Sequence, residues 1–434
     1  MRTASIHQQR GAAALVVTML LVLAMLIVVA YANRNIVVEA RSSANQYRST
    51  QAFEAAEAGL EWALAKLNDA TTIGDDCLPS GASGALSFRD RQLHDDGAAL
   101  TPLTWNDAGT LVPLQAACVR TADGWSCSCP STGAPVLAAA ASAATFPVFT
   151  VEFAPGARPG IVRAIATGCT RSDALCAATS DAGHEAAARV EVAFGLVPGL
   201  RAAPVAALMA RGNVDAGASA LGLHNLDSVQ GGATVHAGGS VIGTAMRFTA
   251  PAGSSLDGSI VSGDANLAGL TADRFFARWF GMDKATWMAQ PAATQVACSG
   301  DCSSAIADAV TAGSRLLAVD GDLALEGPVS LGTIERPIVV VSTGALRLRG
   351  AVTLHGVVVA SSIDWRDTAA GALIQGAAIS EGDYSGDAAV DIVHDAAILA
   401  RLQRGSGSFA RVNGSWKDFC PRRGQHSRRS VRTR

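Results

Sequence analysis

The chain has few charged and few aromatic residues for its length of 434: charged side chains make up 16 % and aromatic ones 5 %. Its formal net charge of −3 gives no overall electrostatic reason to bind nucleic acid. We find no P-loop, HExxH, dinucleotide fingerprint or GxSxG turn, so we expect neither enzyme activity nor a cofactor. The 44 glycines and the many alanines instead suit an exported β structure built from small residues.

Charge is also absent from residues 12–31, which form one apolar run. About 20 such residues cross a bilayer as a helix, because hydrocarbon offers no partner for exposed backbone groups. The preceding leader carries Arg2, His7 and Arg10 and no acidic residue, which predicts a cytoplasmic N-terminus and export of the rest. The helical pattern continues to about Leu67. We therefore expect a transmembrane and amphipathic stem helix over residues 12–67, roughly 80 Å long.

A cleaved secretory signal is the competing interpretation of this segment. Residues 30–32 have the small-x-small form that signal peptidase cuts. However, the apolar run is longer than the ~7–15 residues of a signal core. Helix signals also pass through the site, since proline is absent from 35–67 and Gly59 is the only glycine there. These features favour a retained stem, whereas a mature N-terminus at Asn33 would support the signal.

The second half of the stem has an apolar stripe. Its members recur at spacings of three and four and so share one helical face: Phe53, Ala56, Leu60, Leu64 and Leu67. This stripe needs a partner. We expect an antiparallel sheet, formed from strands at 147–153, 160–167 and 186–195, to pack on it.

The leader, Gly11, the apolar run and its amphipathic extension resemble the N-terminal region of PilX-type minor pilins. Residues 10–16 (RGAAALV) and 51–64 (QAFEAAEAGLEWAL) carry the resemblance. It implies cleavage by a prepilin peptidase after Gly11, ending the leader at residues 1–11, and methylation of Ala12. The apolar run would then remain in the mature protein.

The resemblance also implies how the subunit assembles with other major and minor pilins. Major pilins carry a glutamate at the fifth mature position, which pairs with the N-terminal amine of a neighbour, but this chain has Val16 there. Family analogy then indicates a rare subunit at or near the filament tip. The residues expected to take part in filament assembly are Val16, Phe53, Leu60, Leu64 and Leu67.

Beyond the stem we expect an α+β, mainly β, chain with two further regions. Residues 68–200 should form a pilin-like α/β region with loops, in which 68–145 show little periodicity and 81–84 and 135–144 look like loop or linker. From 204 to 402, strand starts at 316, 338, 357 and 377 recur near a period of 20. This period predicts a β-solenoid-like domain, a parallel β-helix, and an antiparallel sandwich is the alternative. A helical insertion at 271–312 should cap one end with its aromatic residues.

Nine cysteines suit export, because the periplasm supports disulfides. Spacing does not fix the connectivity. An odd count leaves at least one thiol free or paired outside the chain, and Cys77 with the distant Cys420 is one possible pair. The remaining candidates are Cys169 with Cys176, Cys298 with Cys302, and Cys118 with either Cys127 or Cys129.

Three polar segments are weaker candidates. Asp320 and Asp322 are weak calcium candidates, since carboxylates at solenoid turns are usually just solvated; we expect no metal. Asp387, Asp391 and Asp395 would line one face in a glycan-active solenoid. Residues 403–434 should be a basic disordered tail, in which 421–434 carry six arginines; the alternative is contact with an acidic surface.

These observations predict a minor pilin-like structural subunit of type IV pilus assembly. It would sit in the bacterial inner membrane as a single-pass protein with a periplasmic body, and then at the pilus or cell surface. There it would promote filament initiation or present an adhesive body to a surface target. The alternative is an exported periplasmic β-solenoid that binds or cleaves glycans.

Overall fold

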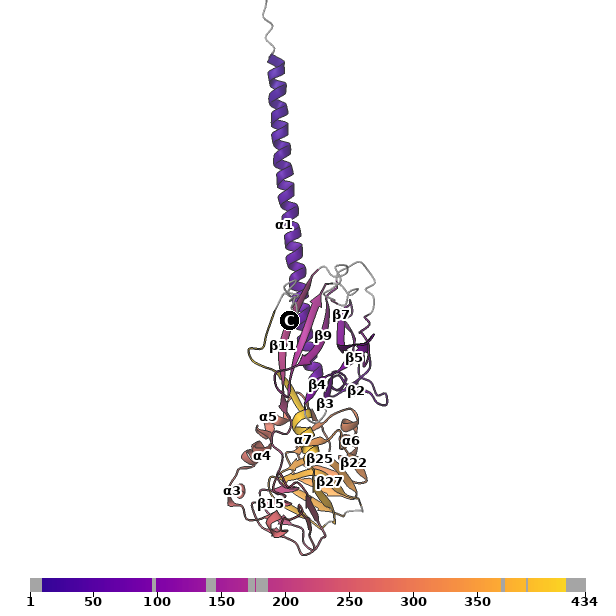
Figure 1. Cartoon of the computed structure of the whole chain (residues 1–434), viewed down its shortest axis with the longest axis vertical. Coiled ribbons are helices and arrows are strands. Elements are labelled where there is room, and N and C mark those ends of the chain that lie inside the picture. Colours follow the sequence, from indigo (N-terminus) through magenta and orange to yellow (C-terminus); the bar gives the residue numbers. More distant parts are fainter. Residues whose placement is uncertain are drawn as a thin grey trace, which may run out of the picture.

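The computed structural model describes residues 10–95, 99–137, 146–170, 176, 186–367, 371–387 and 389–418, apart from the side chains of 10–13 and 35. Its longest element is the stem, α1 (Arg10–Asn68), one continuous helix of 59 residues. The predicted single helix is confirmed. Residues before about Gln51 stand clear of the rest of the chain, and residues from Ala52 onward are packed against it (Figure 1).

The packed half of α1 lies on a six-stranded antiparallel sheet with the order β30-β11-β10-β9-β7-β8. All three predicted strands are present. Gly168 of β10 faces the helix so closely that a Cβ there would overlap the carbonyl oxygen of Ala52. The strands are β7 (Gln115–Arg120), β8 (Trp125–Ser128), β9 (Val148–Pro155), β10 (Ile161–Cys169), β11 (Ala187–Pro198) and β30 (Gly407–Arg411).

Residues 72–113, where the sequence shows little periodicity, contain several short elements around the predicted loop at 81–84. They form α2 (Phe88–Gln92) and three two-stranded antiparallel sheets. The strands are only two to four residues long, too short to show a hydrophobic period in the sequence. They are β1 (Thr72–Ile73) with β2 (Leu86–Ser87), β3 (Leu93–Asp95) with β4 (Leu100–Pro102), and β5 (Thr104–Asp107) with β6 (Thr110–Pro113).

Residues 208–394 form a second unit, the parallel-strand body, at the end of the molecule opposite the free stem (Figure 1). Its strands belong to one twelve-stranded and one six-stranded sheet, and the pairs that join them are parallel. The first sheet holds β12 (Leu208–Ala210), β14 (Gly222–Asn225), β15 (Val235–Ala237), β17 (Arg247–Thr249), β18 (Ile260–Val261), β19 (Ala293–Gln295), β20 (Leu316–Val319), β22 (Val329–Leu331), β23 (Ile338–Ser342), β25 (Val352–Ala360), β27 (Leu373–Ser380) and β29 (Asp391–His394).

The second sheet of the body is narrower and follows the first along the chain. After six strands of the first sheet the chain turns and adds a short strand to the second, as β23 is followed by β24; the six are β12, β15, β20, β23, β25 and β27. Its members are β13 (Val214–Asp215), β16 (Val241–Ile242), β21 (Leu323–Glu326), β24 (Leu346–Arg349), β26 (Ile363–Arg366) and β28 (Tyr384–Gly386).

One column of aliphatic side chains runs through the core of the body. Each residue in it lies in register with the next strand's residue, and all but the last are buried. Successive members from 317 to 378 are 23, 18 and 20 residues apart, near the predicted period of 20, whereas those from 208 to 260 are 27 and 25 residues apart. The column is Leu317, Val340, Val358, Ala378, Leu208, Val235 and Ile260.

The order of strands in space differs from their order in the sequence. Leu208 of β12 pairs with Ala378 of β27, and Gly222 of β14 pairs with Asp391 of β29. The segment 208–261 is therefore stacked after 316–394. Between the two, the chain crosses to the opposite end of the body, where β19 pairs with β20. A repeat period describes neighbouring strands and gives no sign of such a long-range junction.

The crossing segment contains η1 (Asp257–Ser259), α3 (Ala265–Ala268), α4 (Ala272–Phe280) and α5 (Lys284–Met288). The expected helical insertion is present, but its aromatic residues do not cap an end. Phe276, Phe280 and Trp287 are buried against Val339 and Val357, on the outer side of β23 and β25. The end of the core is covered instead by α6 (Ser303–Thr311), whose Ile306 belongs to the inner cluster.

The body is inserted between two neighbouring strands of the antiparallel sheet. The chain leaves β11 at Pro198 and returns through α7 (Ala396–Gly405) to β30, where Gly407 pairs with Pro198. The prediction of a disordered tail from residue 403 is therefore wrong for residues 403–418. The aromatic side chain of Phe409 in β30 completes the core under the stem. Residues 419–434 lie outside the described residues.

Candidate assembly stem and body junction

The free half of the stem is apolar and exposed. Side chains from Leu15 to Val29 are between about half and three quarters exposed, and Val16 is 56 % exposed. By length and composition this helix can cross a membrane. Val16 is thus available to lipid or a neighbouring subunit, and it offers no carboxylate to either. Gly11 and Ala12, the predicted processing residues, lie in the first turn of α1.

The stripe on the packed half of the stem lies against the antiparallel sheet, as the sequence predicted. Leu60 and Leu67 are buried in the core beneath the sheet, in one cluster with Val151 and Val192. Their predicted role in filament contacts is therefore wrong, because side chains enclosed within the chain cannot reach a neighbour. Phe53 and Leu64 are half-buried on the same cluster.

Four disulfides join the described cysteines. Cys118–Cys127 links β7 to β8, so Cys127 rather than Cys129 is the partner of Cys118. Cys77 pairs with Cys129, so its possible pairing with Cys420 is wrong. These partners are 52 residues apart, and spacing alone could not join them. Cys420 lies outside the described residues. The predicted pairs Cys169–Cys176 and Cys298–Cys302 are confirmed.

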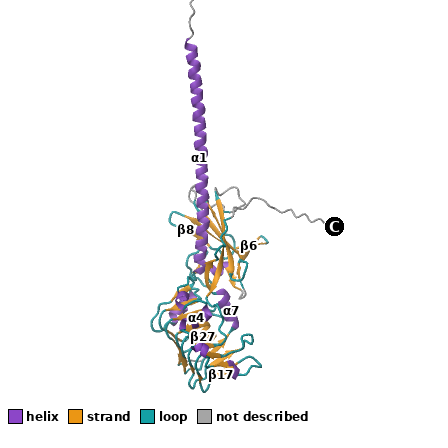
Figure 2. Ribbon diagram, turned by 90° about the vertical axis from the view of Figure 1, so that its left-hand side faces the viewer, coloured by secondary structure: helices purple, strands orange, loops and turns teal. Residues whose placement is uncertain are grey.

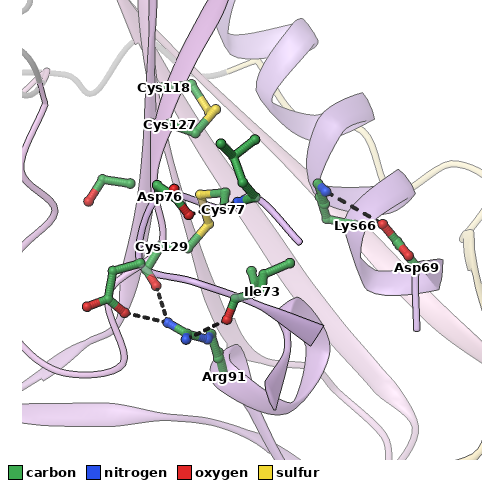
Figure 3. Close-up of a disulfide and its surroundings, with 12 residues drawn as sticks. Lys66, Asp69, Ile73, Asp76, Cys77, Arg91, Cys118, Cys127 and Cys129 are labelled. Atoms are coloured by element: carbon green, nitrogen blue, oxygen red, sulfur yellow. Dashed lines mark hydrogen bonds and ion pairs between the residues drawn. A yellow bond between two sulfur atoms is a disulfide. The ribbon is translucent and has the colours of Figure 1, made fainter. Parts of the chain in front are cut away.

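Arg91 of α2 ties the Cys77–Cys129 region together (Figure 3). Its guanidinium donates to the Cys129 carbonyl oxygen at 2.8 Å and to the Ile73 carbonyl oxygen at 2.7 Å, and it pairs with Asp75 at 2.6 Å. Charge-assisted bonds of this kind are the stronger class of hydrogen bond. The loops beside the stem's end are thus held both covalently and electrostatically.

The stem also holds the strand that returns from the body. Asn68, the last residue of α1, is buried and pairs with both backbone groups of Phe409. Its side-chain nitrogen donates to the Phe409 carbonyl oxygen at 3.0 Å, and its oxygen accepts from the Phe409 N–H at 2.7 Å. The Asn68 side chain therefore makes the two hydrogen bonds that a neighbouring strand would otherwise make to Phe409 of β30.

Buried arginines continue this junction toward the body. Arg89 donates to the carbonyl oxygens of Gly405 at 2.6 Å and Gly407 at 2.9 Å, with its guanidinium 4.9 Å from the centre of the Phe409 ring. Burial lowers the pKa of Arg89 to about 10. Arg315 donates to the same Gly405 oxygen at 3.0 Å, and burial lowers its pKa as well. Both guanidinium groups are largely shielded from water and donate to backbone carbonyl oxygens. Separating the junction would break these hydrogen bonds and leave shielded charges unpaired, which costs free energy, so the two arginines hold the junction together.

The weak calcium candidates have other partners. Asp320 accepts a hydrogen bond from the Thr343 hydroxyl at 2.9 Å, and Asp322 pairs with Arg347 at 3.0 Å. Both serve to tie one turn to the next along the body. Among the described residues, no group of three or more His, Cys, Asp or Glu side chains is placed to hold a metal ion.

The three carboxylates considered for glycan chemistry each make a different contact. Asp391 pairs with His224 at 3.1 Å and Arg247 at 2.6 Å, between neighbouring strands. Asp395 is the N-cap of α7, and Asp387 lies 4.0 Å from Arg366. Each of these carboxylates thus makes a contact that ties together neighbouring strands, turns or a helix end.

The far end of the body carries exposed apolar side chains. Figure 2 shows β17 at the end of the molecule farthest from the free stem. In this last turn of the stack, Ile242 and Leu256 are about half exposed, and Val229 is 90 % exposed. The end opposite, by contrast, is closed by α6. This surface was not predicted, since isolated apolar residues in glycine-rich loops give no periodic signal.

The long helix is apolar and exposed over its first half and packs on an antiparallel sheet over its second half. Residues 10–61 match the family model described as PilX N-terminal, so this part of the chain is similar to the N-terminal region of PilX-type pilins. No curated protein and no solved structure matches the chain.

Proposed function

We propose that this protein is a minor subunit of the type IV pilus that sits at the filament tip. The observation that carries the proposal is the continuous α1, exposed and apolar over its first half and packed over its second. An exposed apolar half-helix can exchange lipid contacts for contacts with other stems at little net cost. Val16 removes the carboxylate that would pair with a subunit ahead, which suits a subunit with none ahead.

The position of the body supports the tip as well. It lies along the direction of the stem, beyond the antiparallel sheet (Figure 1). In a filament whose stems run along its axis, that space belongs to the next subunit toward the tip. We propose that the body is a β-solenoid, because its paired strands are parallel and stacked in register over the aliphatic column. Its role would be structural rather than catalytic: priming assembly or adhering to a surface.

Processing follows from the same proposal. A prepilin peptidase would cut after Gly11 and methylation would modify Ala12, with the leader in the cytoplasm and the body in the periplasm. The cut keeps residues 12–31, which hold the subunit in the inner membrane until assembly. Cleavage by signal peptidase would instead release the body from the membrane, and would support the alternative of an exported periplasmic protein that binds or cleaves glycans.

Gold labelling of an epitope inserted in the exposed loop at Gly253 tests the placement, since a Cβ at this position meets open space. We expect label at filament ends only. Label along the whole shaft would contradict a tip subunit. A second strain with the same epitope on a major pilin controls for access of the antibody.

A further inference from the structure

A lysine and a glutamate meet in a shielded site under the helical crossing segment of the body. Lys284 is the first residue of α5, and Glu381 follows β27 directly, 97 residues later in the chain. The Lys284 Nζ atom lies 2.5 Å from Oε2 of Glu381. The two side chains are 13 % and 4 % exposed, so water is largely excluded from both. An ion pair buried in this way loses hydration that the mutual attraction repays only in part.

The surroundings of this pair suit neutral groups better than charged ones. Oε1 of Glu381 is buried and has no hydrogen-bond partner among the described residues. Burial raises the pKa of this carboxyl. The Lys284 Nζ atom also contacts the carbonyl oxygen of Ser342 at 3.3 Å, and it lies 5.7 Å from the centre of the Phe276 ring. Surroundings of low polarity favour an amine beside a carboxylic acid over two ions.

Both residues are fixed by their backbones. The Glu381 N–H donates to the Ala360 carbonyl oxygen at 2.9 Å, and the Glu381 carbonyl oxygen accepts from the Arg211 guanidinium. Lys284 directly follows Asp283, the N-cap that fixes the start of α5. Reacting groups held in contact behave as if they were very concentrated, with effective molarities of about 10⁵–10⁸ M when they are well oriented. The nucleophile and the carboxyl carbon, one bond beyond Oε2, are thus held together by the fold.

We propose that Lys284 and Glu381 form an intramolecular amide bond. The ammonium group first passes a proton to the carboxylate. The neutral Nζ then attacks Cδ of Glu381 and the Cδ–Oε2 bond breaks. The leaving oxygen takes two of the three ammonium protons with it as one water molecule, so the reaction needs no oxidant or other reactant. The third proton stays on the amide nitrogen, where the Ser342 carbonyl oxygen remains its acceptor.

Asp273 of α4 is the group that can carry the proton. It lines the same cleft as Lys284, and its charge acts on the carboxyl of Glu381. A carboxylate beside the pair can take a proton from the attacking nitrogen and deliver it to the leaving oxygen. Asp273 is exposed, so its replacement leaves the packed core unchanged.

The amide bond ties the crossing segment to the sheet that this segment covers. Otherwise α4 and α5 are held there mainly by the packing of aromatic side chains such as Phe276 and Trp287 against β23 and β25. A covalent tie keeps these helices in place when the body is pulled. The bond belongs to the body alone and does not depend on the proposed place of the protein in a filament.

Tryptic digestion and mass spectrometry of the full chain, reduced and alkylated, test this inference. Trypsin does not cut after an acylated lysine. We expect a branched peptide in which residues 279–315 are joined to residues 367–401, lighter than the two together by one water molecule. The peptide that ends at Lys284 should be lost. Complete cleavage after Lys284 without any branched peptide would overturn the inference and would leave the proposed pilus role untouched.

Two substitutions and a matched control complete the test. Lys284→Arg should abolish the branched peptide, and a branched peptide that persists would overturn the assignment to this lysine. Asp273→Asn, which keeps the fold testable if Lys284→Arg does not fold, should slow bond formation by about 10²-fold or more. Asp308→Asn, at an exposed position of α6, should form the bond as the unchanged protein does. Equal rates in the two aspartate variants would overturn the role of Asp273.

Discussion

At the scale of single residues, Asn68 connects two parts of the chain that lie far apart in the sequence. It ends the stem and satisfies both backbone groups of Phe409, a residue 341 positions later in the chain. Both partners are buried, and a buried backbone group without a partner costs about 1–3 kcal/mol. One amide thus joins the helix, the returning strand and, through β30, the body.

Asn68→Ala should therefore lower the free energy of unfolding by about 2–4 kcal/mol, because two backbone groups lose their partner. Denaturant unfolding of the detergent-solubilised chain measures it. Asn266→Ala, at an exposed position of α3, should change the value by less than about 0.5 kcal/mol. Equal effects of the two substitutions would show that Asn68 does not hold the junction.

Asp301 gives a prediction with a defined pH range. It accepts from the hydroxyl and N–H of Ser303 at the start of α6, and chiefly the hydroxyl bond lowers the pKa of this carboxyl below 3.8. A lowered carboxyl pKa means that the unfolded state binds the proton more readily. The stabilisation is therefore complete above pH 3.8 and is lost as pH falls through the folded-state pKa.

Asp301→Ala should cost about 0.5–1.5 kcal/mol near neutral pH, the usual worth of a hydrogen bond, because Ser303 loses its acceptor, and less below pH 3.8. Thermal unfolding of the two proteins over a pH series checks this convergence. A difference in stability that stays constant down to the lowest pH would contradict the role given to the ionised Asp301 carboxylate.

At the scale of elements, the sequence predicted helices and strands well where they are long or regular. The stem, the strands β9 to β11 and the period near 20 were all visible, because each repeats a pattern over many residues. The short strands of 72–113 were not, and neither was β30, whose neighbour β11 precedes it by about 200 residues. Pairing at such separations depends on the tertiary fold and leaves no local signal.

The contact between stem and sheet depends on Gly168, since any side chain there meets the Ala52 carbonyl. Gly168→Ala should push α1 away from β10 and destabilise the chain by at least about 2 kcal/mol. Gly81→Ala, where a Cβ meets open space, is the matched control. Denaturant unfolding compares the two variants. An unchanged free energy of unfolding for Gly168→Ala would mean that the helix packs less closely on β10 than described.

At the scale of the whole molecule, the body is an insertion into a pair of adjacent strands. Gly199 N–H donates to the Ser406 carbonyl oxygen at 2.9 Å, so the two ends of the insertion meet. This arrangement allows a pilin-like unit to carry a large extra domain without altering the sheet under its stem. The sequence could predict both units, but not that the second interrupts the first.

Replacing residues 200–405 by an Asn-Gly turn should leave a β11–β30 hairpin and a stem that still assembles. If the body occupies the place of the next subunit, as proposed, the shortened protein should enter the shaft as well as the tip. Gold labelling of an epitope at Gly81 in both forms tests this, since that loop remains. Continued confinement to the tip would assign the restriction to Val16 instead of the body.

The central claim is that the apolar first half of α1 remains in the mature protein and enters a filament. Mass spectrometry of the N-terminal peptide from purified pili measures this directly. The account predicts a peptide that begins with N-methylated Ala12. A mature chain that begins at Asn33 would contradict it, because such a protein keeps no part of the apolar run.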